Sequence, residues 1–245
     1  MRIVILLSFV LSCVISAVLG GRLVKAGLRT RTAPELAYGA SLLLAGTGGV
    51  VRLVVHGFLG AGAEYHGWIV FAACLRLLTL MALTWGIHSI FRTQDAWSLL
   101  LVGVFWLLGA AGLGIVWSAP GGLAEAGLVY TLGDATNGLA VIWGCAESFG
   151  YHAKMKRRLV LGLADPLTVL QFQMWGIGFF FAVLASATLF AGTVTLGAAI
   201  TTEPALMVAV QLFMLGTAVV TWAAFYPPEF LRARVRGRTA AASSD

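Results

Sequence analysis

Four ionisable side chains lie within long apolar stretches of the sequence: Arg52, His56, Arg76 and Asp134. An ionised group in hydrocarbon costs on the order of 2.5–3.5 kcal/mol, so such a residue usually has an oppositely charged partner or belongs to a functional site. Arg52 and His56 are four residues apart, and Asp134 and Asn137 are three apart, which places each pair on one face of a helix. The five residues predict a polar cluster that forms a structural ion pair or binds a small polar or anionic ligand.

The charged members of this cluster are expected at similar depth in a membrane. Counted at about 1.5 Å per residue from the outward end of each apolar segment, Arg52 lies roughly 9 Å deep, Asp134 roughly 12 Å and Arg76 roughly 13 Å. At this depth the sequence offers two arginines but only one aspartate, so one guanidinium needs another partner, because an unpaired buried charge is costly. Water, Glu64 or Glu203 from the adjoining connections, or an anionic ligand would balance the second arginine. The alternative is an Asp134 ion pair that only locks helices together.

A metal site is a weaker interpretation of residues at the same end of the molecule. Two histidines and a carboxylate can hold zinc, and His56, Glu64 and His66 lie close together in the sequence. Proximity across a short connection permits such a site without specifying it, and haem is disfavoured because His88 is expected near the opposite membrane face. We expect neither a metal nor another cofactor. We also expect no enzyme, because the sequence offers no nucleophile paired with a base.

The composition indicates the environment that these side chains occupy. The chain has 245 residues, of which 60% are hydrophobic and 11% charged, and its mean hydropathy is +0.93. Soluble domains carry about 25% charged residues. The composition therefore predicts an integral membrane protein and excludes a disordered chain, a disulfide-based secreted scaffold and a nucleic-acid-binding domain.

Apolar segments long enough to cross a bilayer, each of about 20 residues, predict an all-α membrane protein with a single bundle of seven transmembrane helices over residues 1–230. A basic and then disordered tail is expected over 231–245. Prolines mark several of the breaks between segments, where a helix begins or ends. The seven expected spans are about 3–21, 36–58, 67–90, 97–118, 126–149, 168–192 and 204–226.

The basic residues predict the orientation of this bundle, because Lys and Arg accumulate in cytoplasmic connections. Connections that contain Glu64, Glu125 and Glu203 carry no Lys or Arg, whereas the alternate connections carry most of the sixteen. We therefore expect the N-terminus outside and the C-terminus in the cytoplasm, and a cleaved signal peptide over 1–20 is disfavoured because it would break the pattern. The residues expected at the cytoplasmic side are Arg22, Lys25, Arg29, Arg31, Arg92, Lys154, Lys156, Arg157, Arg158, Arg232, Arg234, Arg236 and Arg238.

The same basic residues predict contact with an anionic inner leaflet, at about 1 kcal/mol for each charge near the surface. A membrane protein or cytoplasmic protein that docks on them is the alternative. Nucleic acid is not expected as a partner, since the positive charge follows the orientation rule. Near the same face, Glu147 is expected to pair with His152 or Lys154 at the end of its helix.

Short motifs spread over residues 34–229 resemble a group of uncharacterised bacterial seven-helix inner-membrane proteins. The resemblance implies a fold and a bacterial inner membrane, but no activity. Retinal-binding rhodopsins are excluded because the last apolar segment has no lysine. The motifs are Pro34-Glu35-Leu36, Leu161-Gly162-Leu163-Ala164-Asp165-Pro166, Trp175-Gly176 and Phe225-Tyr226-Pro227-Pro228-Glu229.

These observations favour a receptor or sensor that binds a small polar or anionic ligand in an outward-facing pocket within the membrane. A small-solute transporter and a structural or accessory subunit without a ligand are the alternatives. The shape of the pocket distinguishes the first two: a receptor needs a cavity that closes below Arg76, whereas a transporter needs a path that continues toward Glu147.

Overall fold

The computed structural model describes residues 2–54, 66–118, 123–196 and 203–233, and helices are the only regular structure in those ranges. Seven long helices are followed by a short eighth helix over 229–233. The long helices are α1 (Arg2–Thr30), α2 (Ala33–Val54), α3 (His66–Phe91), α4 (Ala96–Ser118), α5 (Leu123–Val160), α6 (Pro166–Leu196) and α7 (Pro204–Phe225).

Local sequence signals set several helix ends. Thr32 Oγ1 donates a hydrogen bond to Glu35 in the first turn of α2, and Asp165 accepts one from the backbone N–H of Thr168 at 3.1 Å, which caps α6. Pro204 occupies the first turn of α7, where a missing N–H costs nothing. Between α5 and α6 the chain turns at Gly162, whose φ of +70° favours glycine.

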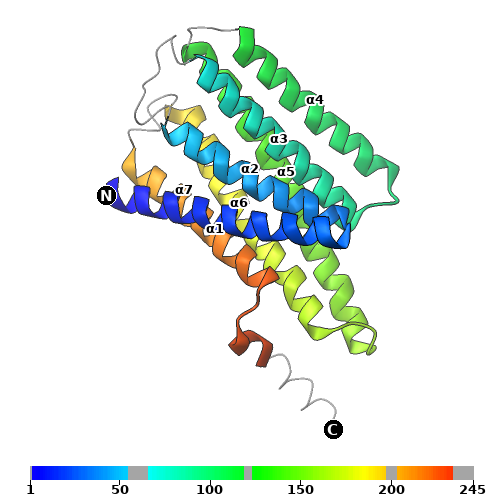
Figure 1. Ribbon diagram of the computed structural model, residues 1–245. Helices are drawn as coiled ribbons and strands as arrows, with labels where there is room; N and C mark the ends of the chain where they lie inside the picture. The colour runs from blue at the N-terminus through cyan, green and yellow to red at the C-terminus, as the bar shows by residue number, and fades with distance from the viewer. Residues whose placement is uncertain (1, 55–65, 119–122, 197–202, 234–245) are drawn as a thin grey trace.

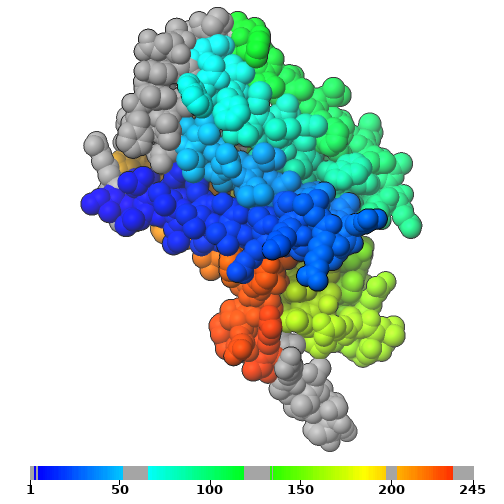
Figure 2. Space-filling model, viewed as in Figure 1, coloured from blue at the N-terminus to red at the C-terminus, as the bar shows by residue number. Residues whose placement is uncertain are grey.

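The helices form a closed bundle in which each packs on the next along the chain (Figure 1). α1 also contacts α7, and α3 also contacts α5. Successive helices run in opposite directions, so the α1–α2, α3–α4 and α5–α6 connections and the end of α7 lie at one end of the bundle. We call this the basic end, because it carries Arg22, Arg92, Lys154 and Arg232. The α5–α6 turn and the short eighth helix project from it (Figure 2).

Five helices are long and apolar enough to cross a membrane: α1 from Ile5 onward, α3, α4, α6 and α7. Over the residues that the structure describes, α2 and α5 do not meet the same criteria. Part of each of these two helices, residues 52–54 of α2 and residues 123–132 of α5, has side chains outside the described set. The protein is therefore a multi-pass, all-α membrane protein, and the seven spans, the orientation and the particular membrane stay predictions.

Two helices extend well beyond the apolar segments from which they were predicted. α1 continues past residue 21 to Thr30, and α5 continues past residue 149 to Val160. Arg22, Lys25 and Arg29 and the basic residues over 154–158 therefore lie on helices, and the prediction that they occupy connections is wrong. The physical reason is that Lys and Arg favour helix as strongly as most apolar residues, so leaving the hydrocarbon does not end a helix.

The bundle is packed most closely near the basic end. Leu19, Leu80, Ile87 and Val102 belong to one buried cluster together with several aromatic side chains. Tyr38 stacks on Trp175 with ring centroids 5.7 Å apart, and Phe105 stacks on Trp143 at 6.2 Å. Offset and edge-to-face aromatic pairs add to the stabilisation from burial alone. We call this half of the bundle the core half and the other the cavity half.

Glycine lets α1 and α2 approach each other closely. A Cβ at Gly20 would lie 2.7 Å from the carbonyl oxygen of Gly39, and a Cβ at Gly39 would lie 2.7 Å from the backbone nitrogen of Val24. Small residues at such crossings permit the backbone contact that holds helices together in lipid, where the hydrophobic effect between helices is absent.

Candidate functional site

Two residues of the predicted polar cluster, Arg76 on α3 and Asn137 on α5, line the same cavity of about 300 Å³ in the cavity half. The Arg76 guanidinium lies against the backbone of α5 at Gly133. A Cβ at Gly133 would be 3.1 Å from Cζ of Arg76 and 3.2 Å from each Nη atom. Any larger residue at 133 would have to displace the guanidinium, so glycine here allows an arginine to lie flat on a neighbouring helix.

Six helices, α2 to α7, contribute to the cavity wall. Most of the described lining residues are glycine, alanine or aliphatic. The polar side chains in the wall are Arg76, Thr79, Thr136, Asn137 and Ser186. Thr79 donates its hydroxyl to the carbonyl oxygen of Leu75 at 2.8 Å, so this hydroxyl proton is used within its own helix. The cavity is therefore mainly apolar, with its polar groups concentrated on α3, α5 and α6.

The remaining members of the predicted cluster lie outside the described residues or side chains. Arg52 is on α2 and Asp134 on α5, but their side chains are not among those described, and neither are His56 and Glu64. Asp134 directly follows Gly133, so its backbone is at the level of Arg76. The five-residue cluster thus stays a prediction, of which the structure brings two members to one cavity.

Of the three residues in the weaker zinc interpretation, only His66, at the start of α3, has a described side chain. Among the described residues, no group of three His, Cys, Asp or Glu side chains is placed to hold a metal ion. His56 and Glu64 fall outside that search, so the weaker interpretation of a metal at this position stays untested.

The cavity ends toward the basic end of the bundle. Along α3 its described lining stops at Leu80, and along α5 it stops at Asn137. The next turn of α5 contributes Ala140, which is completely buried, and Phe105 of α4 is 4% exposed. Glu147 is not among the described lining residues. The aromatic core half thus closes the cavity on this side.

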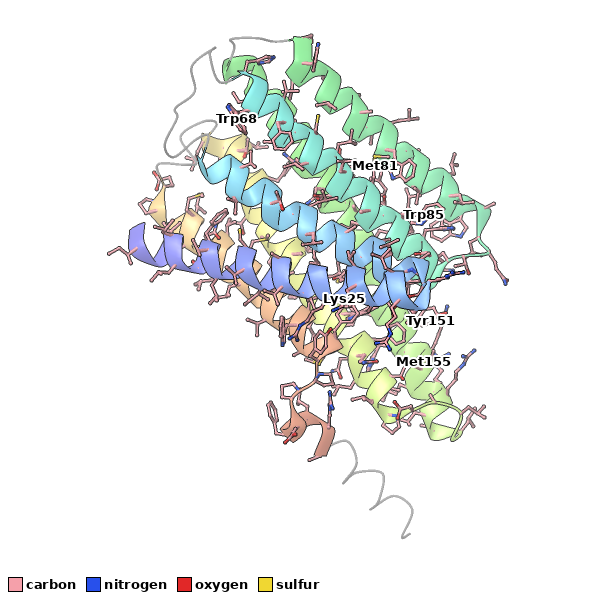
Figure 3. The ribbon with its side chains drawn as sticks, in the orientation of Figure 1. Lys25, Trp68, Met81, Trp85, Tyr151 and Met155 are labelled. Carbon is pink, nitrogen blue, oxygen red and sulfur yellow. The ribbon has the colours of Figure 1, made fainter. Side chains whose placement is uncertain are left out.

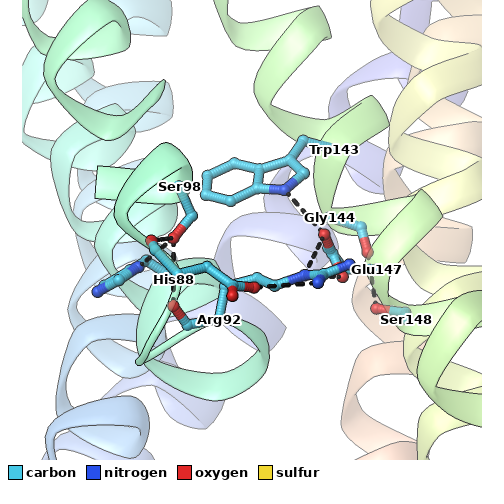
Figure 4. Close-up of polar contacts among 8 residues, drawn as sticks. His88, Arg92, Ser98, Trp143, Gly144, Glu147 and Ser148 are labelled. Carbon is cyan, nitrogen blue, oxygen red and sulfur yellow. Dashed lines mark hydrogen bonds and ion pairs between the residues drawn. The ribbon is translucent and has the colours of Figure 1, made fainter. Parts of the chain in front are cut away.

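A second polar cluster lies at the basic end, where Arg92 and Glu147 meet beside Trp143 (Figure 4). Arg92 Nε lies 2.9 Å and 3.0 Å from the two carboxylate oxygens of Glu147, and Arg92 Nη1 donates to Asp95 at 3.0 Å. Trp143 Nε1 donates to Glu147 at 3.3 Å, and the guanidinium lies 5.3 Å from the centre of the Trp97 ring. The hydrogen bonds that Arg92 donates to Glu147, and then to Asp95, raise the pKa of Arg92 above its ordinary value, so this group stays charged.

This cluster corrects the expected partner of Glu147. The structure pairs Glu147 with Arg92, 55 residues away in the chain, and not with His152 or Lys154. His152 Nδ1 instead lies 3.0 Å from the carbonyl oxygen of Val169 on α6, and Lys154 Nζ lies 5.4 Å from the centre of the Tyr151 ring. Figure 3 shows Tyr151 at the basic end of the bundle. The sequence spacing of two residues on different helices does not indicate whether they meet. The prediction from sequence was therefore limited to partners on the same helix as Glu147.

A buried hydrogen-bond network fixes the connection between α3 and α4 beside this ion pair. His88 Nδ1 lies 2.8 Å from Oγ of Ser98, and the completely buried Ser98 donates its hydroxyl to the carbonyl oxygen of Asp95 at 2.6 Å. A hydroxyl that donates to Asp95 can accept from His88, which favours the tautomer with the proton on Nδ1. In this network His88 on α3 is joined to Ser98 at the start of α4.

No family model, curated protein or solved structure matches the chain. The resemblance to bacterial seven-helix inner-membrane proteins accordingly stays an expectation from short motifs.

Proposed function

We propose that the protein is a receptor-like or sensor-like membrane protein that binds a small polar or anionic ligand in the cavity of the cavity half. The observation that carries the proposal is an arginine side chain, Arg76, in the wall of a cavity of about 300 Å³ that six helices of the bundle line. This volume is at the lower end of the range for ligand sites, about 300–1,000 Å³.

The polar residues of the wall suit recognition of a carboxylate or a similar group. A guanidinium presents five N–H donors in a planar fork, and the Asn137 amide can both donate and accept. In an apolar cavity such contacts are stronger than in water, because the effective dielectric constant is lower. A ligand that meets Arg76, Thr136 and Asn137 together would contact both α3 and α5.

The closed core half favours a receptor or sensor over an open transport path. Below the cavity the bundle is filled by aromatic side chains and tied across α3 and α5 by the Arg92–Glu147 ion pair. A transporter remains the second candidate, in which this ion pair would have to open for solute to leave at the basic end. A structural subunit without a ligand is the third, in which Arg76 serves only to hold α3 against α5.

The test is a thermal-shift screen of the purified protein against small anionic and zwitterionic metabolites, repeated on Asn137→Leu and on Gln173→Leu. Asn137 lines the cavity, whereas Gln173 is exposed on α6. We expect stabilisation of the parent protein that Asn137→Leu loses and Gln173→Leu keeps. No stabilisation by any compound, or equal loss in both variants, would favour the structural role, and uptake of a bound compound into proteoliposomes would favour the transporter.

A further inference from the structure

The cavity wall has an apolar side, on α4, next to its polar side. All the described lining residues of α4 are apolar, and their spacing forms one face of that helix: Leu108, Gly109, Gly112, Leu113 and Val116. We call these five residues the apolar wall. The guanidinium of Arg76, the amide of Asn137 and the hydroxyl of Thr136 lie on α3 and α5, the two helices that neighbour α4.

The volume limits the size of a ligand that meets both sides. An apolar cavity of ~150 Å³ holds one benzene molecule, which has six non-hydrogen atoms. A cavity of about 300 Å³ therefore suits a ligand of about twelve non-hydrogen atoms by the same ratio. A small inorganic anion would reach only the polar side and leave the apolar wall against water or empty space. With such an anion bound, the aliphatic side chains of α4 would have no contact with the ligand.

We infer that the ligand is a small amphipathic anion, with a carboxylate-like head at Arg76 and Asn137 and a short unbranched hydrocarbon tail along the apolar wall. The inference rests on the proposed binding function and adds the class of compound. Straight-chain carboxylates of about eight to ten carbons, which have about ten to twelve non-hydrogen atoms, have the matching size and chemistry. The head gains charge-assisted hydrogen bonds at the polar side, and the tail removes apolar surface from water.

α4 offers a matched pair of glycines for testing the position of the tail. Gly112 belongs to the apolar wall, and a Cβ built there meets nothing within 4 Å, so a larger side chain has room. Gly114 is two residues further along the helix and therefore on the opposite face. It is exposed, and a Cβ there also meets nothing within 4 Å. Leucine at either position should leave the fold intact, but only leucine at 112 should fill the cavity.

The experiment measures binding of acetate, butanoate, hexanoate, octanoate and decanoate, with octan-1-ol as the uncharged control. Calorimetry and thermal shift are used, on protein in a nonionic detergent and below the micelle-forming concentration of each compound. We expect octanoate to bind at least tenfold more tightly than acetate or octanol. Gly112→Leu should weaken octanoate binding at least tenfold and move the optimum to butanoate or hexanoate, whereas Gly114→Leu should match the parent protein.

Head recognition is tested with Arg76→Gln, whose circular dichroism and elution volume are compared with those of the parent protein to check folding. This variant should lose the preference for octanoate over octanol. The inference is overturned if affinity does not depend on chain length, or if Gly112→Leu and Gly114→Leu behave alike. In that outcome acetate binding that requires Asn137 would leave the proposed function standing. If no carboxylate and no other polar or anionic compound binds, the proposed function falls as well.

Discussion

The core half and the cavity half of the bundle are built from the same helices but are packed differently. Near the basic end, aromatic side chains such as Trp143, Phe105 and Tyr38 fill the space between helices. Toward the other end, the same helices present Gly48, Gly112 and other small residues, and a cavity remains. The core half therefore contributes most of the packing that stabilises the bundle, and the cavity half provides the space for a ligand. Substitutions of the same type should have different consequences in each half.

The two halves also use their arginines differently. Arg92 at the basic end has two carboxylate partners and an aromatic ring, and its geometry is that of a helix clamp. Arg76 lies on the wall of the cavity. Both arginines are on or next to α3 and both reach α5, so the same two helices are joined at two levels. We expect substitutions around Arg92 to lower the stability of the protein and substitutions around Arg76 to weaken ligand binding.

The largest expected effect comes from two leucines of α3. Leu83 is buried in the core half, and Leu77 lines the cavity. Leu83→Ala should lower the free energy of unfolding by about 3–5 kcal/mol, since it leaves a void among packed side chains. Leu77→Ala should cost about 1–2 kcal/mol, because part of that side chain already faces open space. Denaturation in detergent measures both, and equal costs would show that the halves are packed alike.

A smaller effect is expected from the ion pair at the basic end. Glu147→Gln should cost about 1.5–3 kcal/mol, since it removes the charge that Arg92 and Trp143 both contact. Asp95 also contacts Arg92, but its side chain is 39% exposed, so Asp95→Asn should cost less than about 1 kcal/mol. A cost for Asp95→Asn that equals or exceeds that of Glu147→Gln would contradict the assignment of Glu147 as the main partner.

Gly133→Ala should separate stability from binding. Alanine favours helix by about 1 kcal/mol over glycine, which offsets the crowding that a Cβ causes at the Arg76 guanidinium. We therefore expect unfolding to change by less than about 1 kcal/mol, while ligand affinity falls several-fold because Arg76 must move. Gly150→Ala on the same helix is the control, because a Cβ there meets nothing within 4 Å. Unchanged affinity in Gly133→Ala would argue against a role for Arg76 in binding.

The smallest effect on stability is expected from single cysteines that report orientation. In a background without Cys13, Cys74 and Cys145, Arg157→Cys and Glu203→Cys should both fold normally, because both positions are exposed. The orientation rule predicts that a membrane-impermeant maleimide labels Glu203→Cys in intact bacterial cells and labels Arg157→Cys only after lysis. The reverse pattern would invert the predicted topology, and the cavity half would then face the cytoplasm.

Much of the fold could be predicted because it depends on local chemistry. Prolines at 34, 166 and 204 lie in the first turns of helices, as expected. Counting depth along separate segments placed Arg76 and Asp134 at a similar level, and in the structure the Arg76 guanidinium lies against Gly133, the residue before Asp134. Helix ends at charged residues were predicted less well, since a change in polarity is not a signal that stops a helix. The extensions to Thr30 and Val160 follow from this.

By itself, the sequence determined that the protein is helical and lies in a membrane, because composition, the length of apolar segments and turn residues act locally. Only the tertiary structure decided which polar groups meet, which glycines line open space and where the cavity ends. The Arg92–Glu147 pair and the contact of Arg76 with Gly133 join helices that are separated in the chain. Such contacts depend on the rotation and crossing of packed helices, which hydrophobic patterns do not specify where lipid and protein interior are equally apolar.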